Sequence, residues 1–381
     1  MENLKKKICF ITGTRADYGI MAPVMRELAE HPEVELQIIA TNMHLSPEFG
    51  MTVSEIEGDG FTVDCRIESL EPGDTPGATV RSMAKVQTGL ADAFTRLQPN
   101  MVVILGDRYE ALAAASAAVV FGIPIAHLHG GETTEGAIDD AFRHAITKLS
   151  TYHFASTPQY ADKIVSMGAP KQNVFHSGGP GAQGYDMEGT EAYDFVEKTG
   201  MNPDEPFILL AFHPVTRLPD NGKQELKAIT EALDSFISQG YRVLVTMPNS
   251  DPGNSDIREF LKIWSENALP GMVTLVESLG ARLFHYAMDK AMAMVGNSSA
   301  ALIEAPTHRL PAVNVGNRQK GRAHGISVID VPGEKARIEA ALRAALSVEM
   351  KSVMMGLTVS SLNPYFKENS SHYISEKLVN L

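Results

Sequence analysis

The sequence predicts two α/β domains, each a doubly wound sheet of parallel strands covered by helices. Short apolar runs of strand length alternate with helix-length amphipathic segments along the whole chain. A chain of 381 residues is also too long for one ordinary hydrophobic core. The alternation is interrupted by the glycine-rich segment 177–182, so we place the hinge there. The predicted domains are 1–182 and 183–365, with a C-terminal helix at about 366–381 packing back on the first.

The predicted elements follow from apolar runs that are bounded by turn residues. In the first half, strands are expected near 8–11, 36–40, 102–105, 123–128, 152–156 and 173–176, and helices at 19–30, 80–97, 109–121 and 138–149 among others. In the second half, strands are expected near 207–212, 242–247, 272–276, 291–295, 311–315 and 326–330, with helices such as 223–238 and 334–346. An irregular stretch at 356–366 precedes a last short helix at about 367–380.

Composition limits the class of function. The net charge of −13 argues against a nucleic-acid groove, which requires a basic face. No apolar run approaches the roughly 20 residues of a membrane helix, so no membrane partner is expected. The two cysteines, Cys9 and Cys65, do not make a disulfide framework, and we expect a cytoplasmic location.

Polar side chains follow two neighbouring apolar strands of the first half. Asp107 comes directly after strand 102–105 and Gly106, and His129 and Glu132 follow strand 123–128. The carboxyl ends of parallel strands face the ligand crevice, so we expect these groups to converge on one pocket. A carboxylate directly after a buried strand is a poor choice for packing, so a functional role is favoured for Asp107.

Asp139 and Arg143 follow on a predicted helix. Their i,i+4 spacing places them on one helix face, either as site residues or as a structural ion pair. A metal bound by His127, His129 and Glu132 is the weaker alternative to acid/base chemistry, because spacing alone is poor evidence for a ligand set. We therefore expect neither a metal nor a cofactor.

Two glycine-containing turns are candidate anion sites. The first strand ends in Gly13-Thr14-Arg15 and leads into a helix, so Arg15 marks either a phosphate site or a tight turn. The glycine spacing of a dinucleotide fingerprint is absent there. After strand 291–295, Ser298 or Ser299 either binds a diphosphate or is an ordinary helix N-cap. Glu304, further along that helix, either accepts the two hydroxyls of a ribose or is a solvated glutamate.

Other strand ends of the second half add candidate ligand contacts. His213 follows strand 207–212. It either acts on the ligand, as a hydrogen-bond donor to phosphate or as a general acid, or has a structural role. Its place at the crevice edge favours a functional role. Asn249 follows strand 242–247. Arg318 lies in a basic run that is either a ligand contact or a solvated loop.

Taken in order, these motifs resemble the hydrolysing UDP-N-acetylglucosamine 2-epimerases, the enzymes that begin sialic acid-type sugar synthesis. The resemblance covers nearly the whole chain and rests on the segments 13–18, 106–108, 129–132, 138–140, 143–148, 213–214, 296–299 and 318–319. It implies two Rossmann-like domains of the GT-B type with an active-site cleft between them. It also implies that the second domain mainly holds the nucleotide, while the first supplies most of the chemistry.

The resemblance also implies a reaction. The C2 proton and UDP are lost to give a 2-acetamidoglucal, water adds at C1, and a proton returns to the other face of C2, releasing free N-acetylmannosamine. The catalytic candidates are then Asp107, His129, Glu132, Asp139 and His213. The substrate-binding candidates are Arg15, Arg108, Arg143, Asn249, Ser298, Ser299, Glu304 and Arg318.

One departure from the resemblance concerns His129. Many relatives carry a catalytic glutamate there, so the role passes to His129 or to Glu132. The change also marks a second possible substrate, UDP- or GDP-linked N,N'-diacetylbacillosamine for legionaminic acid synthesis. A GT-B glycosyltransferase and a catalytically silent sugar-nucleotide sensor are the competing functions. Relatives imply a homodimer or homotetramer.

Overall fold

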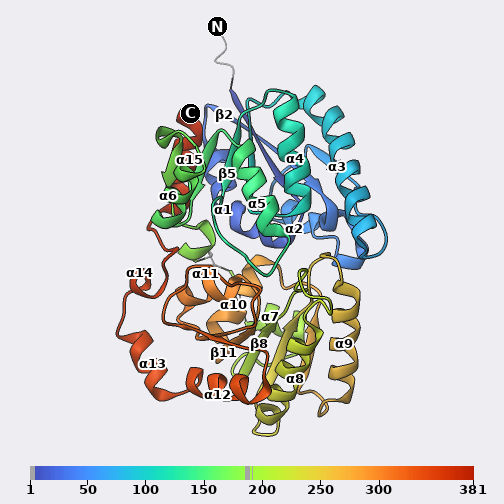
Figure 1. Ribbon diagram of the computed structural model, residues 1–381, viewed down its shortest axis with the longest axis vertical. Coiled ribbons are helices and arrows are strands. Elements are labelled where there is room, and N and C mark those ends of the chain that lie inside the picture. The colour runs from blue at the N-terminus through green and yellow to red at the C-terminus, as the bar shows by residue number, and fades with distance from the viewer. Residues whose placement is uncertain (1–4, 185–188, 191) are drawn as a thin grey trace. The chain divides into compact units, whose positions relative to one another are not determined.

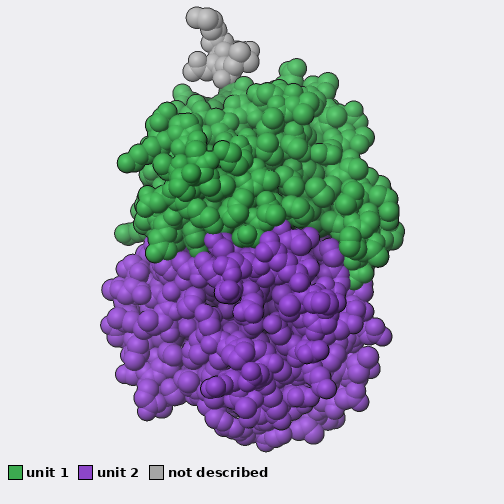
Figure 2. Space-filling model, viewed as in Figure 1, with its two compact units in different colours: residues 1–132, 139–183, 367–381 green, residues 133–138, 184–366 purple. Residues whose placement is uncertain are grey.

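The computed structural model describes residues 5–184, 189–190 and 192–381 and divides the chain into two compact units (Figure 2). Unit 1 draws its described residues from Met1–Glu132, Asp139–Gln183 and Lys367–Leu381, and unit 2 from Thr133–Ile138 and Gly184–Phe366.

The assignment of residues 133–138 to unit 2 differs from the continuous domain 1–182 that the sequence predicts. The backbone N–H of Glu135 donates to the carbonyl of Lys320 at 3.2 Å. The N–H of Ile138 donates to the hydroxyl of Thr216 at 3.0 Å. Unit 2 therefore supplies partners for the backbone of this segment, which periodicity cannot reveal.

The described part of unit 1 is built on a parallel sheet of seven strands in the order β3-β2-β1-β4-β5-β6-β7. Its strands β2 and β5 are labelled in Figure 1. The strands are β1 Lys6–Thr12, β2 Val34–Thr41, β3 Cys65–Ile67, β4 Met101–Leu105, β5 Ile125–Leu128, β6 Tyr152–Ala155 and β7 Val174–His176. The helices are α1 Arg15–Glu30, α2 Val53–Gly58, α3 Pro76–Leu97, α4 Tyr109–Val120, α5 Asp139–Leu149, α6 Pro158–Ser166 and α15 Ser370–Asn380. Short 3-10 helices are η1 Asn42–Leu45, η2 Pro47–Phe49, η3 Lys171–Asn173 and η4 Pro180–Gln183.

Both faces of the unit 1 sheet are buried. Ile8 and Phe10 of β1 pack in a core with residues of α1 and α15, whereas Cys9 and Ile11 pack in a second core with residues of α3 and α4. Successive side chains of a strand point to opposite faces, so helices cover the sheet on both sides. This two-sided burial explains why the strands read as continuous apolar runs.

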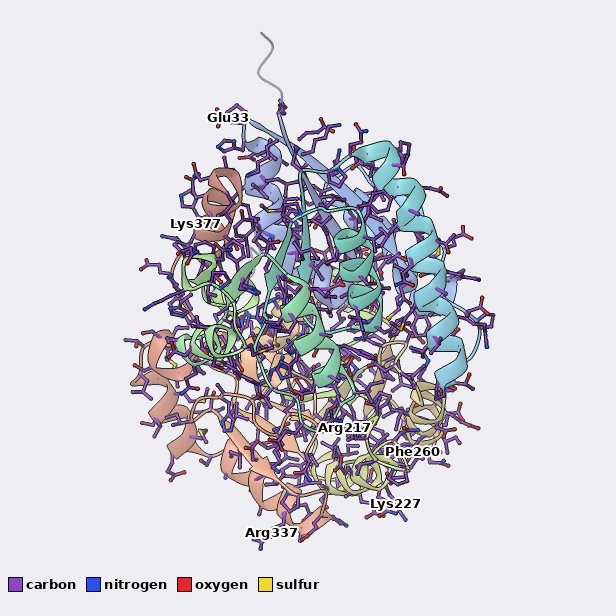
Figure 3. The ribbon with its side chains drawn as sticks, turned by 45° about the horizontal axis from the view of Figure 1, so that its top comes forward. Glu33, Arg217, Lys227, Phe260, Arg337 and Lys377 are labelled. Carbon is purple, nitrogen blue, oxygen red and sulfur yellow. The ribbon has the colours of Figure 1, made fainter. Side chains whose placement is uncertain are left out.

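The C-terminal helix α15 belongs to unit 1. It packs against α1, and its Ile374 and Leu378 are fully buried in the unit 1 core. The ammonium group of Lys377, labelled in Figure 3, lies 5.5 Å from the ring centroid of Phe175 in β7. The last residues of the chain therefore stabilise the unit in which the chain begins.

In its described residues, unit 2 has a parallel sheet of six strands in the order β10-β9-β8-β11-β12-β13. The strands are β8 Phe207–Ala211, β9 Arg242–Thr246, β10 Val273–Val276, β11 Ala293–Gly296, β12 Ala312–Val315 and β13 Val328–Val331. The helices are α7 Ala192–Thr199, α8 Lys223–Ile237, α9 Asn254–Asn267, α10 Gly280–Lys290, α11 Ala300–Ile303, α12 Lys335–Ala345, α13 Val348–Met355 and α14 Val359–Leu362, with a 3-10 turn η5 Ala305–His308. Phe260 of α9, labelled in Figure 3, packs against the core that β8 shares with α8 and α12.

The prediction of two doubly wound parallel α/β sheets is confirmed. Two local features were not predicted. Strand β3 has only three residues at the sheet edge, too few to display a period. The expected irregular stretch 356–366 contains the single-turn helix α14. Among the described residues, no helix is both long and apolar enough to cross a membrane.

Candidate active site

In unit 1, candidate residues follow the carboxyl ends of three adjacent strands. Arg15 follows β1, Asp107 follows β4 and His129 follows β5, and these strands are neighbours in the sheet. Parallel pairing places all three strand ends at one edge, as the sequence predicts. Asp139 is the first residue of α5 and lies one turn before Arg143.

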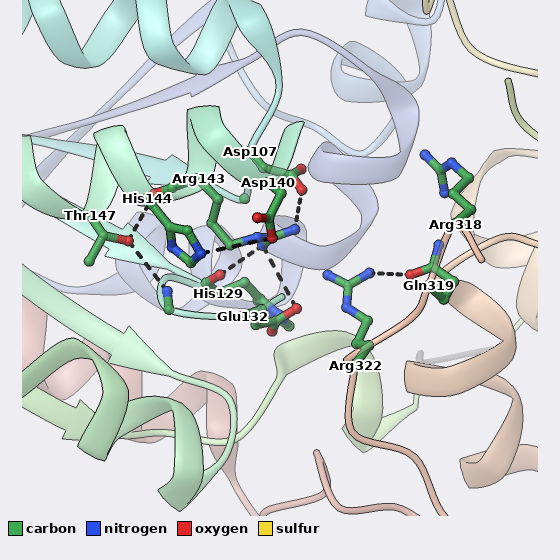
Figure 4. Close-up of polar contacts among 12 residues, drawn as sticks. Asp107, His129, Glu132, Asp140, Arg143, His144, Thr147, Arg318, Gln319 and Arg322 are labelled. Carbon is green, nitrogen blue, oxygen red and sulfur yellow. Dashed lines mark hydrogen bonds and ion pairs between the residues drawn. The ribbon is translucent and has the colours of Figure 1, made fainter. Parts of the chain in front are cut away.

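Arg143 gathers several of these groups. Its guanidinium pairs with the carboxylate of Asp107, lies 3.7 Å from Oε2 of Glu132 and donates to the carbonyl of His129 at 2.8 Å (Figure 4). Arg143 is only 2% exposed, so its charge and those of the acids must balance one another. The structure thus brings together Asp107, His129, Glu132 and Arg143.

His129 and Glu132 form a buried pair. Nδ1 of His129 lies 2.6 Å from Oε1 of Glu132, and the hydroxyl of Ser156 donates to the same oxygen at 2.6 Å. Nε2 of His129 is buried and has no hydrogen-bond partner among the described residues. The carboxylate therefore orients the imidazole through one nitrogen and leaves the other unpaired within the described chain.

The backbone at His129 is strained, with a φ of 60°. A residue other than glycine pays about 1–2 kcal/mol for this left-handed conformation. The bonds from Arg143 to the His129 carbonyl and from Nδ1 to Glu132 hold it there. Strain maintained in this way is typical of functional positions.

His127 has a supporting role. Its Nε2 lies 2.7 Å from the carbonyl oxygen of Gly106, and its Nδ1 lies 3.3 Å from the hydroxyl of Thr147. Burial lowers the pKa of His127 to about 3, so the ring is neutral and donates to Gly106. His127 thereby fixes the turn that presents Asp107. A Cβ on Gly130 would lie 2.7 Å from Nδ1 of His127, which explains this glycine.

The metal alternative fits this geometry poorly, because both ring nitrogens of His127 and Nδ1 of His129 already face protein partners. Within residues 5–184, 189–190 and 192–381, no group of three or more histidine, cysteine or acidic side chains is arranged to hold a metal ion.

The loop after β1, which the sequence left as either a phosphate site or a tight turn, binds a carboxylate of its own helix. The carboxylate of Asp17 accepts hydrogen bonds from the backbone N–H groups of Gly13 and Thr14, both at 3.0 Å. The turn amides are thus already used by the protein. A Cβ on Gly13 would lie 2.6 Å from Oε1 of Glu110, so packing explains the glycine. The side chain of Arg15 stays a candidate for binding an anion here.

Glu110 was missed by the sequence reasoning. It lies in the first turn of α4, is 2% exposed, and its Oε1 is 2.5 Å from Nε of Arg108. Burial raises the pKa of the Glu110 carboxyl, and the neighbouring Arg108 opposes this. Glu110 therefore orients Arg108. The sequence signal that could have identified Glu110 is a charged residue at the start of an otherwise alanine-rich helix.

In unit 2, candidate residues follow adjacent strands in the same way. Asn249 follows β9, His213 follows β8, Ser298 follows β11 and Arg318 follows β12, and the sheet order makes these strands neighbours. The carboxyl edge of the second sheet therefore collects the residues that the sequence assigned to ligand binding.

Asn297 connects this edge. Its side-chain carbonyl accepts from the backbone N–H of His213 at 2.7 Å, and its amide donates to the His213 carbonyl at 2.8 Å. Its own carbonyl accepts from Nη1 of Arg318 at 3.2 Å and from Nε2 of Gln319 at 2.8 Å. Nη1 of Arg322 in turn donates to Gln319 at 2.9 Å (Figure 4). Asn297 lies in the segment 296–299 that the sequence analysis singled out, but no role was predicted for it.

The helix after Ser299 ends one residue before Glu304, which the sequence places on it. Helix α11 has four residues and continues into the 3-10 turn η5. The hydroxyl of Ser298 accepts from the N–H of Ala300 at 3.3 Å, while Ser299 makes no side-chain cap. The ordinary N-cap alternative therefore does not describe Ser299.

Glu304 is not the solvated glutamate of the alternative explanation. Its side chain is 15% exposed, and Oε1 lies 3.4 Å from Nε2 of the buried His285. A largely buried carboxylate requires such a partner. His285 was not a predicted site residue, and its position within a helix gave no signal.

Comparisons with known proteins find a matching family and several related sequences. The family described as UDP-N-acetylglucosamine 2-epimerase matches residues 26–379. A Legionella pneumophila protein named UDP-N,N'-diacetylbacillosamine 2-epimerase (hydrolyzing) is 37% identical over 347 residues, covering 90% of this chain and 89% of its own. A Campylobacter jejuni protein named GDP/UDP-N,N'-diacetylbacillosamine 2-epimerase (hydrolyzing) is 36% identical over 327 residues, covering 86% and 84%. A Neisseria meningitidis serogroup B protein named UDP-N-acetylglucosamine 2-epimerase is 31% identical over 348 residues, covering 90% and 88%.

Solved structures share the fold. The S. aureus MnaA-UDP co-structure matches with a TM-score of 0.79 at 20% identity, covering 98% of this chain and 96% of its own. The Methanocaldococcus jannaschii UDP-GlcNAc 2-epimerase in complex with UDP-GlcNAc and UDP matches with a TM-score of 0.79 at 19% identity, covering 98% and 100%. These matches confirm the fold class expected from the sequence.

Proposed function

The chain belongs to the UDP-N-acetylglucosamine 2-epimerase family and is a hydrolysing nucleotide-sugar 2-epimerase, and we propose that its substrate is N,N'-diacetylbacillosamine linked to UDP or GDP. The two most similar relatives named above carry that sugar in their names, at 37% and 36% identity. This favours the second of the two substrates considered from the sequence over UDP-N-acetylglucosamine.

The proposed reaction has two stages. A base removes the C2 proton while the bond between C1 and the diphosphate oxygen breaks, leaving a double bond between C1 and C2. Water then supplies a hydroxyl at C1, and an acid delivers a proton to the opposite face of C2. The products are the nucleoside diphosphate and the free sugar inverted at C2. Such a sequence needs acid/base groups at C2 and cationic donors for the leaving diphosphate.

The observation that carries the acid/base assignment is the His129–Glu132 pair. Glu132 accepts at Oε1 from Ser156 and faces His129 there, so the imidazole is held by one nitrogen only. We assign the proton transfer to Nε2 of His129, whose buried position has no described protein partner. Glu132 then does what a carboxylate does in a catalytic triad: it orients the ring and stabilises its protonated form.

The other acid/base groups of the proposal are Asp107 and Asp139. Arg143 pairs with Asp107 and so fixes one candidate carboxylate relative to the His129 carbonyl, which it also binds. Asp139 begins the helix that carries Arg143. Two proton-transferring groups of different kinds suit removal on one face of C2 and delivery on the other.

The residues of unit 2 are proposed to bind the nucleotide. Ser298 and Ser299 offer hydroxyls, His213 and Arg318 offer donors to phosphate, and Glu304 offers a carboxylate to the ribose hydroxyls. Asn297 supports the assignment, because it ties His213 and Arg318 to the strand end that carries the serines. Asn249, Arg15 and Arg108 complete the proposed substrate contacts.

The test is a panel of nucleotide sugars incubated with the enzyme in heavy water. UDP-N,N'-diacetylbacillosamine or its GDP analogue is expected to give the nucleoside diphosphate and a free 2-epimer deuterated at C2. Faster turnover of UDP-N-acetylglucosamine would overturn the substrate proposal, and unlabelled product would overturn elimination. Acceptor-independent release with inversion at C2 contradicts a glycosyltransferase, and binding without turnover would instead favour a sensor.

A further inference from the structure

Unit 2 contains a row of polar side chains that the proposed chemistry does not use in full: Glu304, His285, His308 and Asp289. Nε2 of His285 lies 3.4 Å from Oε1 of Glu304. On the other side of the same ring, Nδ1 of His285 lies 2.8 Å from Nε2 of His308. Nδ1 of His308 is 4.0 Å from Oδ1 of Asp289, beyond hydrogen-bond distance. The two histidines are the most buried members of the row, and Asp289 is its exposed end.

Separate elements position the row. His285 and Asp289 lie one turn apart on α10, His308 ends η5, and Glu304 joins α11 to η5. The two imidazoles are both buried, with ring centroids 5.0 Å apart. Two buried histidines in contact must arrange their ring protons consistently, because each neutral ring has one donor and one acceptor.

The surroundings favour one arrangement of these protons. Burial, with a further contribution from His285, lowers the pKa of His308 to about 4, so this ring is neutral near pH 7. With its proton on Nε2, His308 donates to Nδ1 of His285. The proton of His285 then sits on Nε2 and faces the Glu304 carboxylate. The reverse arrangement would turn the lone pair of a neutral His285 towards a negative oxygen.

We propose that His285 is a positioning residue for nucleotide binding: its Nε2–H holds Oε1 of Glu304, so that the other carboxylate oxygen accepts hydrogen bonds from the ribose hydroxyls. This inference rests on the proposed function, which gives Glu304 the ribose. His308 acts behind His285 by fixing its tautomer.

The contacts of Glu304 agree with this division of its two oxygens. Oε1 faces His285, whereas Oε2 makes no hydrogen bond within the described part of the chain. A carboxylate that is already held in one rotamer loses less freedom when a ligand binds, which strengthens binding. The affinity that His285 adds should therefore appear only for ligands with ribose hydroxyls. If His285 had only a general structural role, its loss would weaken ligands with and without these hydroxyls alike.

The experiment compares two probes, UDP and 2',3'-dideoxy-UDP, by calorimetry on the full chain. The same pair of GDP compounds replaces them if the wild-type protein binds GDP more tightly. The variants are His285→Phe, which removes both nitrogens, and His285→Gln, which can donate to Glu304. His372→Phe is the matched control, because His372 pairs with Glu27 on the surface of unit 1.

We expect His285→Phe to weaken UDP binding by about fivefold or more, as for a lost hydrogen bond to a charged group, and to leave dideoxy-UDP binding unchanged. His285→Gln should recover most of the loss, and His372→Phe should behave as wild type. Turnover should show a raised KM with little change in kcat. Equal weakening of both probes, or of neither, would overturn the inference.

Glu304→Gln separates this inference from the proposed function. If Glu304→Gln weakens the binding of both probes equally, or of neither, the ribose role of Glu304 is wrong, whatever His285 does. If Glu304→Gln weakens the binding of UDP but not of dideoxy-UDP, and His285→Phe changes both equally or neither, only the positioning role is wrong. Should His285→Phe not fold, His285→Asn gives the same test, since its shorter side chain does not reach Glu304.

Discussion

Asn297 holds both backbone polar groups of His213. Its side chain accepts from the His213 N–H at 2.7 Å and donates to the His213 carbonyl at 2.8 Å. Asn297 itself is fully buried at the end of β11, and His213 follows β8, its neighbour in the sheet. One amide thus fixes the register of two strand ends where the nucleotide-binding candidates lie.

Replacing Asn297 by aspartate tests this link. A carboxylate would face the His213 carbonyl in place of a donor, so the free energy of unfolding should fall by about 1–3 kcal/mol. UDP affinity should fall as well, because His213 and Arg318 lose their anchor. Urea unfolding and calorimetry measure the two effects. Asn173→Asp is the control, since its exposed amide also donates to a carbonyl, that of Thr151 at 3.0 Å; similar losses in both variants would contradict the prediction.

Glu132→Gln tests the His129 pair. The amide cannot stabilise a protonated imidazole as the carboxylate does, so turnover and deuterium incorporation at C2 should fall by about 100-fold or more. UDP affinity should stay within about twofold. The matched change Glu135→Gln removes an exposed carboxylate paired with Lys320 and should leave turnover near the wild-type value. Retained turnover in Glu132→Gln would remove the pair from the mechanism.

Acid should destabilise unit 1 through His127. Burial lowers its pKa to about 3 in the folded protein, below the ordinary 6.5. Below pH 6.5 the unfolded chain binds a proton that the folded one does not, so stability is full above that pH and falls as pH drops towards 3, by about 1.4 kcal/mol per unit.

Urea unfolding between pH 4 and 7 measures this slope. His127→Gln keeps a donor for the Gly106 carbonyl but does not titrate, so its slope should be smaller by up to about 1.4 kcal/mol per pH unit. Parallel slopes in the wild-type and variant proteins would show that His127 does not resist protonation. His31→Gln, at a partly exposed site, serves as the control.

Two glycines should respond to alanine in opposite ways. Gly296 has a φ of 136°, and a Cβ there would lie 2.0 Å from the backbone oxygen of Ala211. Gly296→Ala should therefore destabilise the protein by about 4 kcal/mol or more. Gly58 ends α2, and its Cβ would meet nothing within 4 Å, so Gly58→Ala should be neutral or stabilise by up to about 1 kcal/mol. Thermal and urea unfolding of both variants check the contrast.

The sequence by itself determined the fold class and most of the candidate residues. Apolar runs such as 102–105 are buried on both faces, so their length and boundaries are local properties that a single sequence displays. Polar residues directly after such runs, including Asp107, His129 and His213, must lie at the carboxyl edge of a parallel sheet. Predicting this position requires only that the strands run parallel.

Only the tertiary structure decided which of these groups touch. Arg143 was expected to share a helix face with Asp139, but it also reaches Asp107 and Glu132 across loops that no sequence spacing relates. The partner of Glu304, His285, lies 19 positions earlier in the chain, counting from 285 to 304. Such contacts depend on how helices and loops pack, because hydrogen bonds and ion pairs form between neighbours in space, and burial then sets their strength and their protonation.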